Sequence, residues 1–119
     1  MRIKTNELRR AALDWAVAKC EGRQEPELVN NFAVAWYTWP NTHYSTDWAQ
    51  GGPIIEREEI NLDNYAKNPK WSAWTPAPDR ESGEAQAYGP TPLIAAMRCY
   101  VASKLGDDVT LPPELEQTA

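Results

Sequence analysis

The segment 89–106, GPTPLIAAMRCYVASKLG, constrains the fold more than any other part of the chain, because it carries complete signals for a helix. Thr91 can cap the amino end, Pro92 suits the first helical position, and Gly106 favours termination. The apolar stripe of this helix consists of Ile94, Met97, Val101 and Leu105, widened by Ala96 and Tyr100. A stripe this wide has to be covered on more than one side, so the sequence predicts a helix over 92–105 within a hydrophobic core.

A second helix is predicted from about Glu7 to Cys20, after a capping side chain at position 5 or 6. Its polar residues form one narrow stripe, and Leu8 and Trp15 lie away from that stripe. Neither helix has another place to bury so much apolar surface. We therefore expect Leu8 and Trp15 to pack against the other helix, at Met97, Val101 or Leu105.

The other regular elements are predicted as strands. They cover residues 28–39, 53–62, 70–75 and 84–89, with short pieces at Ile3 and at 109–111. The fold class that follows is α+β, with two main helices packed on a small antiparallel sheet of about four strands. We expect a single domain over residues 1–119, with a partly frayed tail over 107–119 and an exposed, lid-like loop within 75–88.

The charge balance excludes one class of partner. The 119 residues carry 12 basic and 17 acidic side chains, for a net charge of −5, whereas binding to a nucleic-acid backbone requires clustered Lys and Arg. The sequence also has no apolar run long enough for a membrane span and no recognisable signal peptide, so we expect no membrane partner and a cytoplasmic location. Cys20 and Cys99 are expected to be free, buried thiols.

The segment Tyr44–Ile60, YSTDWAQGGPIIEREEI, combines a polar turn, a tryptophan and a Gly-Gly-Pro sequence. The sequence predicts a sharp bend at residues 51–53, followed by the strand over 53–62. Two interpretations stay open at this point. The bend is common turn chemistry before a strand, and a backbone without Cβ atoms is equally suited to the close approach of a ligand.

The chain resembles the NinX-type proteins of tailed phages and prophages. The segments that carry the resemblance are KTNELRRAALDWAVAKCEG, YSTDWAQGGPIIERE and GPTPLIAAMRCYVASKLGDDV, and the match covers nearly the whole chain. It implies a phage accessory protein that works in the cytoplasm of a bacterial host. The family has no known function, and it supplies neither a reaction nor catalytic residues. The stretch WSAWTPAPDRESGEAQ departs most from the family pattern.

Catalysis receives little support from the sequence. The single histidine, His43, has only Asp47 as a nearby partner, and a metal site normally needs about three or four protein ligands. The carboxylates Glu56, Glu58 and Glu59 look like a solvated face rather than an acid–base pair. No P-loop, GxGxxG or Ser-His-Asp pattern is present. We therefore expect no enzyme, no cofactor and no metal.

Binding of a small flat or anionic ligand, nucleotide-like in character, is the function that these features favour. An indole stacks on a flat ring, glycine allows close approach, and helix amides and arginines attract an anion. The candidate ligand-binding residues are Tyr44, Thr46, Asp47, Trp48, Gly51, Gly52, Arg57, Trp71, Trp74, Thr91 and Arg98. At Thr91 the hydroxyl either caps the helix or leaves the amides of Leu93 and Ile94 to an anion.

The alternative function is a protein-interaction module. The chain has six Trp and five Tyr but one Phe, and exposed Trp and Tyr are typical of hot spots that capture a partner. Such a partner is a host protein or a second copy of this chain. Aromatic side chains that line a concave surface favour a small ligand, and those on a flat face favour a protein.

Overall fold

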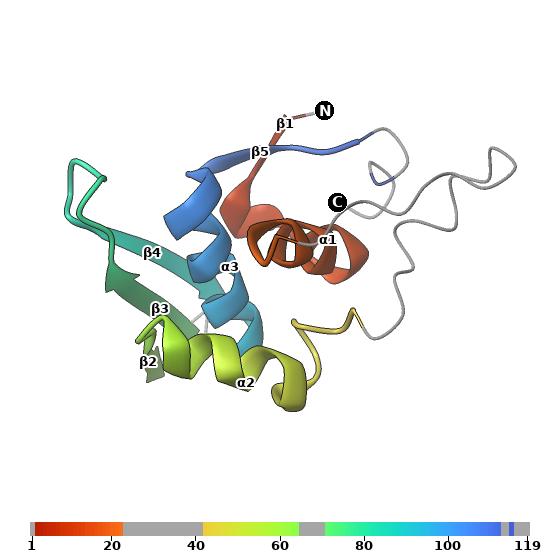
Figure 1. The fold of residues 1–119 in the computed structure, drawn as a ribbon, viewed down its shortest axis with the longest axis horizontal. Coiled ribbons are helices and arrows are strands. Elements are labelled where there is room, and N and C mark those ends of the chain that lie inside the picture. The colour runs from red at the N-terminus through yellow and green to blue at the C-terminus, as the bar shows by residue number, and fades with distance from the viewer. Residues whose placement is uncertain (1, 23–41, 65–70, 113–114, 116–119) are drawn as a thin grey trace, which may run out of the picture.

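Helix α3, Pro92–Leu105, lies at the centre of the molecule, as its wide apolar stripe predicts (Figure 1). The computed structural model describes residues 2–22, 42–64, 71–112 and 115. On one side α3 packs on a three-stranded sheet, and on another it contacts α1, Arg10–Cys20. The helix α2, Trp48–Arg57, also contacts α3. The architecture is α+β, which confirms the predicted fold class.

The larger sheet is antiparallel, with the order β2-β3-β4. Its strands are β2, Asn61–Asn64, β3, Trp71–Pro76, and β4, Glu84–Gly89. The face toward α3 carries small side chains, including the paired Ala73 and Ala87, which are buried and let the helix approach closely. A Cβ at Gly89 would stand 2.9 Å from the backbone nitrogen of Ala95, so glycine is required where β4 meets the first turn of α3.

The smaller sheet joins the two ends of the described chain. Strand β1, Arg2–Lys4, pairs antiparallel with β5, Asp108–Thr110. This pairing confirms the predicted strand at Ile3 and places the second short strand one residue earlier than the prediction. Of the predicted tail, residues 108–110 are paired and both Leu111 and Leu115 are buried.

The predicted helical core is largely confirmed. Leu8, Trp15, Met97 and Val101 belong to one cluster of buried residues, whereas Leu105 is 37% exposed. The first helix begins later than predicted. Residues Thr5–Glu7 form a short 3-10 helix, η1, and Arg9 is extended, so that Leu8 enters the core before α1 starts at Arg10.

The prediction of a sharp bend at residues 51–53 and a strand over 53–62 is wrong, because most of this segment is helical. Asp47 caps α2 by accepting a hydrogen bond from the Ala49 nitrogen at 2.9 Å. The residues Gly51, Ile54 and Ile55, spaced three and four apart, face the rest of the protein, while Glu56 and Arg57 are exposed. Only residues 61 and 62 of the predicted strand lie in a strand, β2.

The turn before α2 is anchored to α1 through a buried carboxylate. Asp14 is 9% exposed, and its Oδ1 accepts a hydrogen bond from the Ser45 nitrogen at 2.9 Å. Burial raises the pKa of Asp14, while the hydrogen bonds from Ser45 and the charge of His43 oppose this shift. This contact fixes the approach of residues 42–47 to the core.

The turn between β3 and β4 is fastened to the end of α3. The Arg80 guanidinium donates to the Ala102 carbonyl at 3.1 Å and to Asp107 Oδ1 at 2.8 Å. Half of residues 75–88, the predicted lid region, belongs to the two strands, and residues 77–83 connect them. The predicted strand over 28–39 lies outside the described residues.

Among the described residues, no helix is long and apolar enough to cross a membrane. Both cysteines are free thiols, as predicted, but only Cys99 is buried, whereas Cys20 is partly exposed. Burial raises the pKa of Cys20 and of Cys99 to about 12, so both remain protonated near neutral pH.

Candidate functional site

The candidate binding residues fall into four regions of the structure rather than one (Figure 1). Residues 44–52 lie in the turn and first half of α2, and Thr91 begins α3 next to them. Arg57 ends α2 and faces the carboxyl-terminal half of α3. Trp71 and Trp74 are on β3, and Arg98 is on the face of α3 toward Leu8 and Tyr88.

At the start of α2, most of the groups proposed to bind a ligand already contact other parts of the protein. A Cβ at Gly51 would stand 2.5 Å from Leu93 Cδ1 and 2.6 Å from the Tyr44 carbonyl oxygen, so the bare backbone serves packing on α3. Trp48 is 53% exposed. A Cβ added at Gly52 would stand 3.9 Å from the Trp48 ring, which is ordinary contact distance. Thr46 is also exposed. Trp48 is therefore the large apolar side chain that this region presents to solvent.

Thr91 is a helix cap. Its hydroxyl oxygen accepts a hydrogen bond from the Ile94 nitrogen at 3.1 Å, and its carbonyl accepts one from the Ala95 nitrogen at 3.0 Å. The capping interpretation is therefore confirmed. One of the amides considered for an anion is used inside the helix.

The two tryptophans of β3 point to opposite faces of the sheet. Trp71 pairs with Gly89 and packs against the core on the α3 side. Trp74 pairs with Asn61 and Gln86 and shares the other face with them. Both indoles are half-buried. They do not form one stacking surface.

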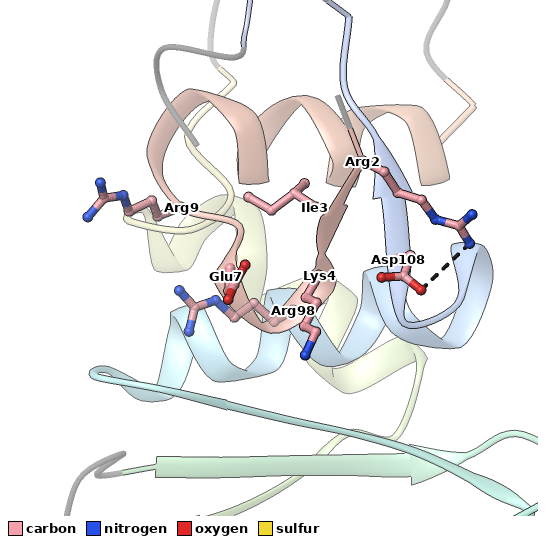
Figure 2. Close-up of a pocket in the computed structure, with 7 residues that line it drawn as sticks. All are labelled: Arg2, Ile3, Lys4, Glu7, Arg9, Arg98 and Asp108. Carbon is pink, nitrogen blue, oxygen red and sulfur yellow. Dashed lines mark ion pairs between the residues drawn. The ribbon is translucent and has the colours of Figure 1, made fainter.

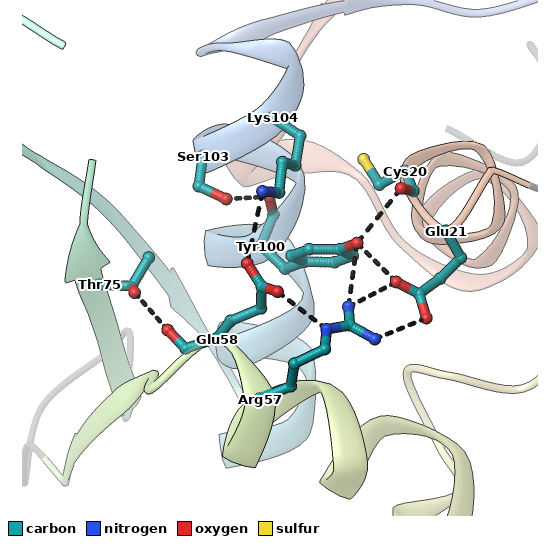
Figure 3. A network of polar contacts seen from close by, with 8 residues as sticks. All are labelled: Cys20, Glu21, Arg57, Glu58, Thr75, Tyr100, Ser103 and Lys104. Atoms are coloured by element: carbon teal, nitrogen blue, oxygen red, sulfur yellow. Dashed lines mark hydrogen bonds and ion pairs between the residues drawn. The ribbon is translucent and has the colours of Figure 1, made fainter. Parts of the chain in front are cut away.

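Arg57 takes part in a dense polar network with residues at the carboxyl ends of α1 and α2 and on α3 (Figure 3). Its Nη2 donates to Glu21 Oε2 at 2.6 Å, its Nη1 to Glu21 Oε1 at 3.2 Å, and its Nε to Glu58 Oε2 at 2.9 Å. The hydroxyl of the buried Tyr100 donates to Glu21 Oε2 at 2.5 Å and accepts from Arg57 at 3.2 Å. We call Arg57, Glu21, Glu58 and Tyr100 the Arg57 network.

Electrostatics in the Arg57 network follow from these contacts. Hydrogen bonds from Arg57 hold the pKa of Glu21 below its usual value, and hydrogen bonds to Glu21 and Glu58 raise the pKa of Arg57. Burial, together with the bond to Glu21, raises the pKa of Tyr100. The network connects the ends of α1 and α2 to α3. Because the carboxylates already neutralise the Arg57 guanidinium, little positive charge remains to attract a ligand.

Arg98 has a different environment. Its Nε donates to the Leu8 carbonyl at 2.8 Å, and its Nη1 donates to the Tyr88 carbonyl at 2.8 Å. Both acceptors are neutral. Burial lowers the pKa of Arg98, the nearby charge of Arg9 lowers it further, and Glu7 opposes the shift. The guanidinium is thus held in a fixed orientation while its charge remains uncancelled by a hydrogen-bonded carboxylate.

Arg98 borders an open hollow of about 760 Å³ between the amino-terminal segment and α3 (Figure 2). We call it the basic hollow. It is lined by Arg2, Ile3, Lys4, Glu7, Arg9, Arg98 and Asp108. Four of these side chains are cations and two are carboxylates. The Arg2 guanidinium lies 3.6 Å from Asp108, and Figure 2 shows the Glu7 carboxylate beside the Arg98 guanidinium.

The basic hollow is suited to holding an anion. Arginine and lysine donors form charge-assisted hydrogen bonds with phosphate and carboxylate groups. In the part of the chain that the structure describes, no group of three or more His, Cys, Asp or Glu side chains could hold a metal ion. The cationic side chains of the basic hollow offer positive charge and hydrogen-bond donors.

Sequence reasoning identified Arg98 but missed Arg2, Lys4 and Arg9. A signal was present, because these basic residues cluster at the start of a chain that is acidic overall. The alternation of Arg2 and Lys4 around the buried Ile3 also places both cations on one face of a strand. The sequence does not show that α3 brings Arg98 to the same place. Arg98 contacts Leu8, which lies 90 residues earlier in the chain.

Comparison with known families places the chain. No curated protein matches the sequence. The model of a protein family described as Bacteriophage P22, NinX matches residues 4–104, which is most of the chain. The matched part includes α1, α2, the three-stranded sheet and all of α3 except its last residue. The chain therefore belongs to the Bacteriophage P22 NinX family of phage proteins.

Proposed function

We propose that this phage accessory protein binds a small anionic ligand in the basic hollow, without turning it over. The observation that carries the proposal is a hollow whose described lining includes four cationic side chains, in a protein of net charge −5. The net negative charge repels an anion from most of the protein surface, so a local cluster of cations directs the anion to the basic hollow. The ligand we propose is phosphate-bearing and nucleotide-like in size.

Two features of the basic hollow support binding over a purely structural role. Its volume of about 760 Å³ lies within the range of about 300 to 1,000 Å³ that is usual for small-molecule sites. The Arg98 side chain is already fixed by the Leu8 and Tyr88 carbonyls, so little conformational freedom is lost when an anion binds. We place this activity in the cytoplasm of the infected host.

The proposal is tested by titrating the protein with inorganic phosphate at fixed ionic strength and measuring heat of binding and the shift in melting temperature. Lys4 lines the basic hollow, so Lys4→Ala is expected to weaken binding about tenfold through loss of one charge-assisted contact. The matched control is Lys104→Ala, which removes the same charge next to Glu58, outside the lining of the hollow.

The control variant should bind phosphate as the unmutated protein does. An equal loss of phosphate affinity in the two lysine variants would mean that net charge, rather than a contact in the basic hollow, causes the effect. Absence of any phosphate-dependent heat or melting shift in the unmutated protein would refute the proposal.

A protein-interaction function is the second candidate, and the exposure of Trp48 favours it. Trp48 is 53% exposed at the first turn of α2, and an exposed indole is a common anchor in protein interfaces. Native mass spectrometry of protein purified from its host separates the two candidates. A reproducible added mass supports the ligand, whereas a dimer mass that Trp48→Ala abolishes supports self-association.

A further inference from the structure

A second, smaller hollow adjoins the basic hollow. It has a volume of about 260 Å³ and lies between η1, β4 and the carboxyl end of α3. We call it the polar hollow. It is lined by Lys4, Thr5, Asn6, Gln86, Ala102, Asp107 and Asp108. Lys4 and Asp108 line both hollows and are partners across the β1–β5 pair, so the two spaces meet at this pair.

The two hollows differ in charge. Four cations and two carboxylates line the basic hollow, whereas the polar hollow has one cation, Lys4, two carboxylates and two amide side chains. A phosphate is attracted to the basic hollow, where cations outnumber carboxylates, rather than to the polar hollow, where they do not. The Asp107 carboxylate is paired with Arg80, so its second oxygen is the one that can accept from a ligand. The acceptors of the polar hollow instead suit groups that donate hydrogen bonds, such as hydroxyls. A ligand spanning both spaces therefore has one orientation.

Backbone groups at the edge of β4 add to the polar hollow. The Tyr88 nitrogen donates to Asn6 Oδ1 at 3.0 Å, so it points away from β3. Backbone groups two residues apart on a strand point to the same side, so the peptide of Gln86 faces this edge as well. The polar hollow is thus bordered by peptide groups as well as by side chains.

The walls of the polar hollow are fixed by contacts between distant parts of the chain. The Thr5 hydroxyl donates to the Gly106 carbonyl at 2.7 Å, and the Thr5 nitrogen donates to the Asp107 carbonyl at 2.8 Å. The Arg80 guanidinium holds the Asp107 carboxylate at 2.8 Å. A site with fixed walls binds a ligand with less loss of conformational entropy.

Among the described residues, no aromatic side chain lines either hollow. Trp48, Trp71 and Trp74 lie elsewhere, so the described lining of the two hollows holds no platform for stacking a base. The body of the ligand is therefore matched by hydrogen bonds rather than by stacking.

We propose that the two hollows together bind a phosphorylated polyol, either a sugar phosphate or the ribose phosphate part of a nucleotide. The phosphate occupies the basic hollow near Arg98 and Lys4, and the hydroxyl groups donate to the acceptors around Asp107, Asp108 and Gln86. This inference rests on the proposed anion-binding function and specifies its ligand.

The test compares inorganic phosphate, ribose 5-phosphate, ribose and adenosine 5′-monophosphate by calorimetry on the full chain. Ribose 5-phosphate is expected to bind about tenfold more tightly than inorganic phosphate, from the added hydrogen bonds, and ribose alone should bind far more weakly. Adenosine 5′-monophosphate that binds more tightly than ribose 5-phosphate identifies a nucleotide as the source, and equal affinity identifies the sugar phosphate.

A pair of variants locates the polyol. Gln86→Ala is expected to remove part of the advantage of ribose 5-phosphate over phosphate, whereas Glu84→Ala, at an exposed position two residues earlier on β4 and outside the polar hollow, should keep it. Equal affinity for phosphate and ribose 5-phosphate in the unmutated protein would overturn this inference and leave anion binding intact. Failure of every phosphate compound to bind would overturn both.

Discussion

Arg57 and Arg98 are arginines on neighbouring helices, but their hydrogen-bond partners differ in charge. The Arg57 side chain is 50% exposed, yet its guanidinium is engaged by Glu21, Glu58 and Tyr100. Arg98 is half-buried, yet its bonds go to the neutral carbonyls of Leu8 and Tyr88. Exposure alone would favour Arg57 as a ligand-binding residue, whereas the charge of the hydrogen-bond partners favours Arg98, as we propose.

The pKa shifts of the two side chains express the same difference. Carboxylates stabilise the charged form of Arg57 and raise its pKa. Burial and the charge of Arg9 lower the pKa of Arg98, which means that its positive charge is held at a cost in free energy. An anion that binds beside Arg98 relieves that cost. The same anion beside Arg57 would compete with two carboxylates.

Replacing Arg98 is expected to have the largest effect. Arg98→Leu leaves the Leu8 and Tyr88 carbonyls without their donors, so the free energy of unfolding should fall by about 2 to 4 kcal/mol, and phosphate binding should be lost. The measurements are urea denaturation and calorimetric titration.

The matched control is Arg57→Leu, the same substitution in the Arg57 network. The pairs that it removes are partly exposed, so the stability loss should be about 1 kcal/mol and phosphate binding should not change. Equal loss of phosphate binding in the two variants would remove the distinction between these arginines.

A smaller effect is expected from Tyr100→Phe. The Tyr100 hydroxyl joins Glu21 and Arg57 and also lies 3.3 Å from the Cys20 carbonyl, so its removal leaves polar groups of α1 and α2 less satisfied. The free energy of unfolding should fall by about 1 to 2 kcal/mol, measured by urea denaturation, with phosphate binding unchanged. Tyr88→Phe is the control, because no hydrogen bond of the Tyr88 hydroxyl occurs among the described residues. A loss of phosphate affinity in Tyr100→Phe would show that the Arg57 network influences the basic hollow.

The sequence predicts α3 and the two later strands of the larger sheet well, because their signals are local. Thr91, Pro92 and Gly106 define the ends of α3 within the segment itself. The alternation in residues 70–75 and 84–89 predicts β3 and β4. The buried stripe also predicts that α3 has neighbours on more than one side, as it does.

The sequence prediction of α2 is wrong because this helix contains Gly51, Gly52 and Pro53, residue types that disfavour a helix. Asp47 is a good capping residue, and the spacing of Gly51, Ile54 and Ile55 is helical, but Gly-Gly-Pro usually breaks a helix. Packing against α3 stabilises the helix here, since only glycine at position 51 lets α2 approach Leu93. The basic hollow was missed for a related reason, because it depends on how distant segments meet.

The smallest effect we expect is the pH dependence of the Arg57 network. The folded protein holds the pKa of Glu21 below its ordinary value of 4.5, first through the bond from Arg57. The stabilisation is therefore present above that value and is lost as the pH falls through the lower, folded pKa. Comparing the unmutated protein with Glu21→Gln from about pH 6 to about pH 3 should show a stability difference, at most about 1 kcal/mol, that shrinks on acidification.

Asp14 provides a comparison of opposite sign. Burial raises its pKa above 3.8, so the ionised form costs stability at neutral pH, and protonation relieves that cost as the pH falls through the raised value. Asp14→Asn should therefore be at least as stable as the unmutated protein near neutral pH, because the amide oxygen can still accept from the Ser45 nitrogen. Its advantage should vanish in acid. Thermal unfolding of both variants across the same pH range separates the two carboxylates, and parallel curves for Glu21→Gln and Asp14→Asn would contradict the assignment of opposite shifts.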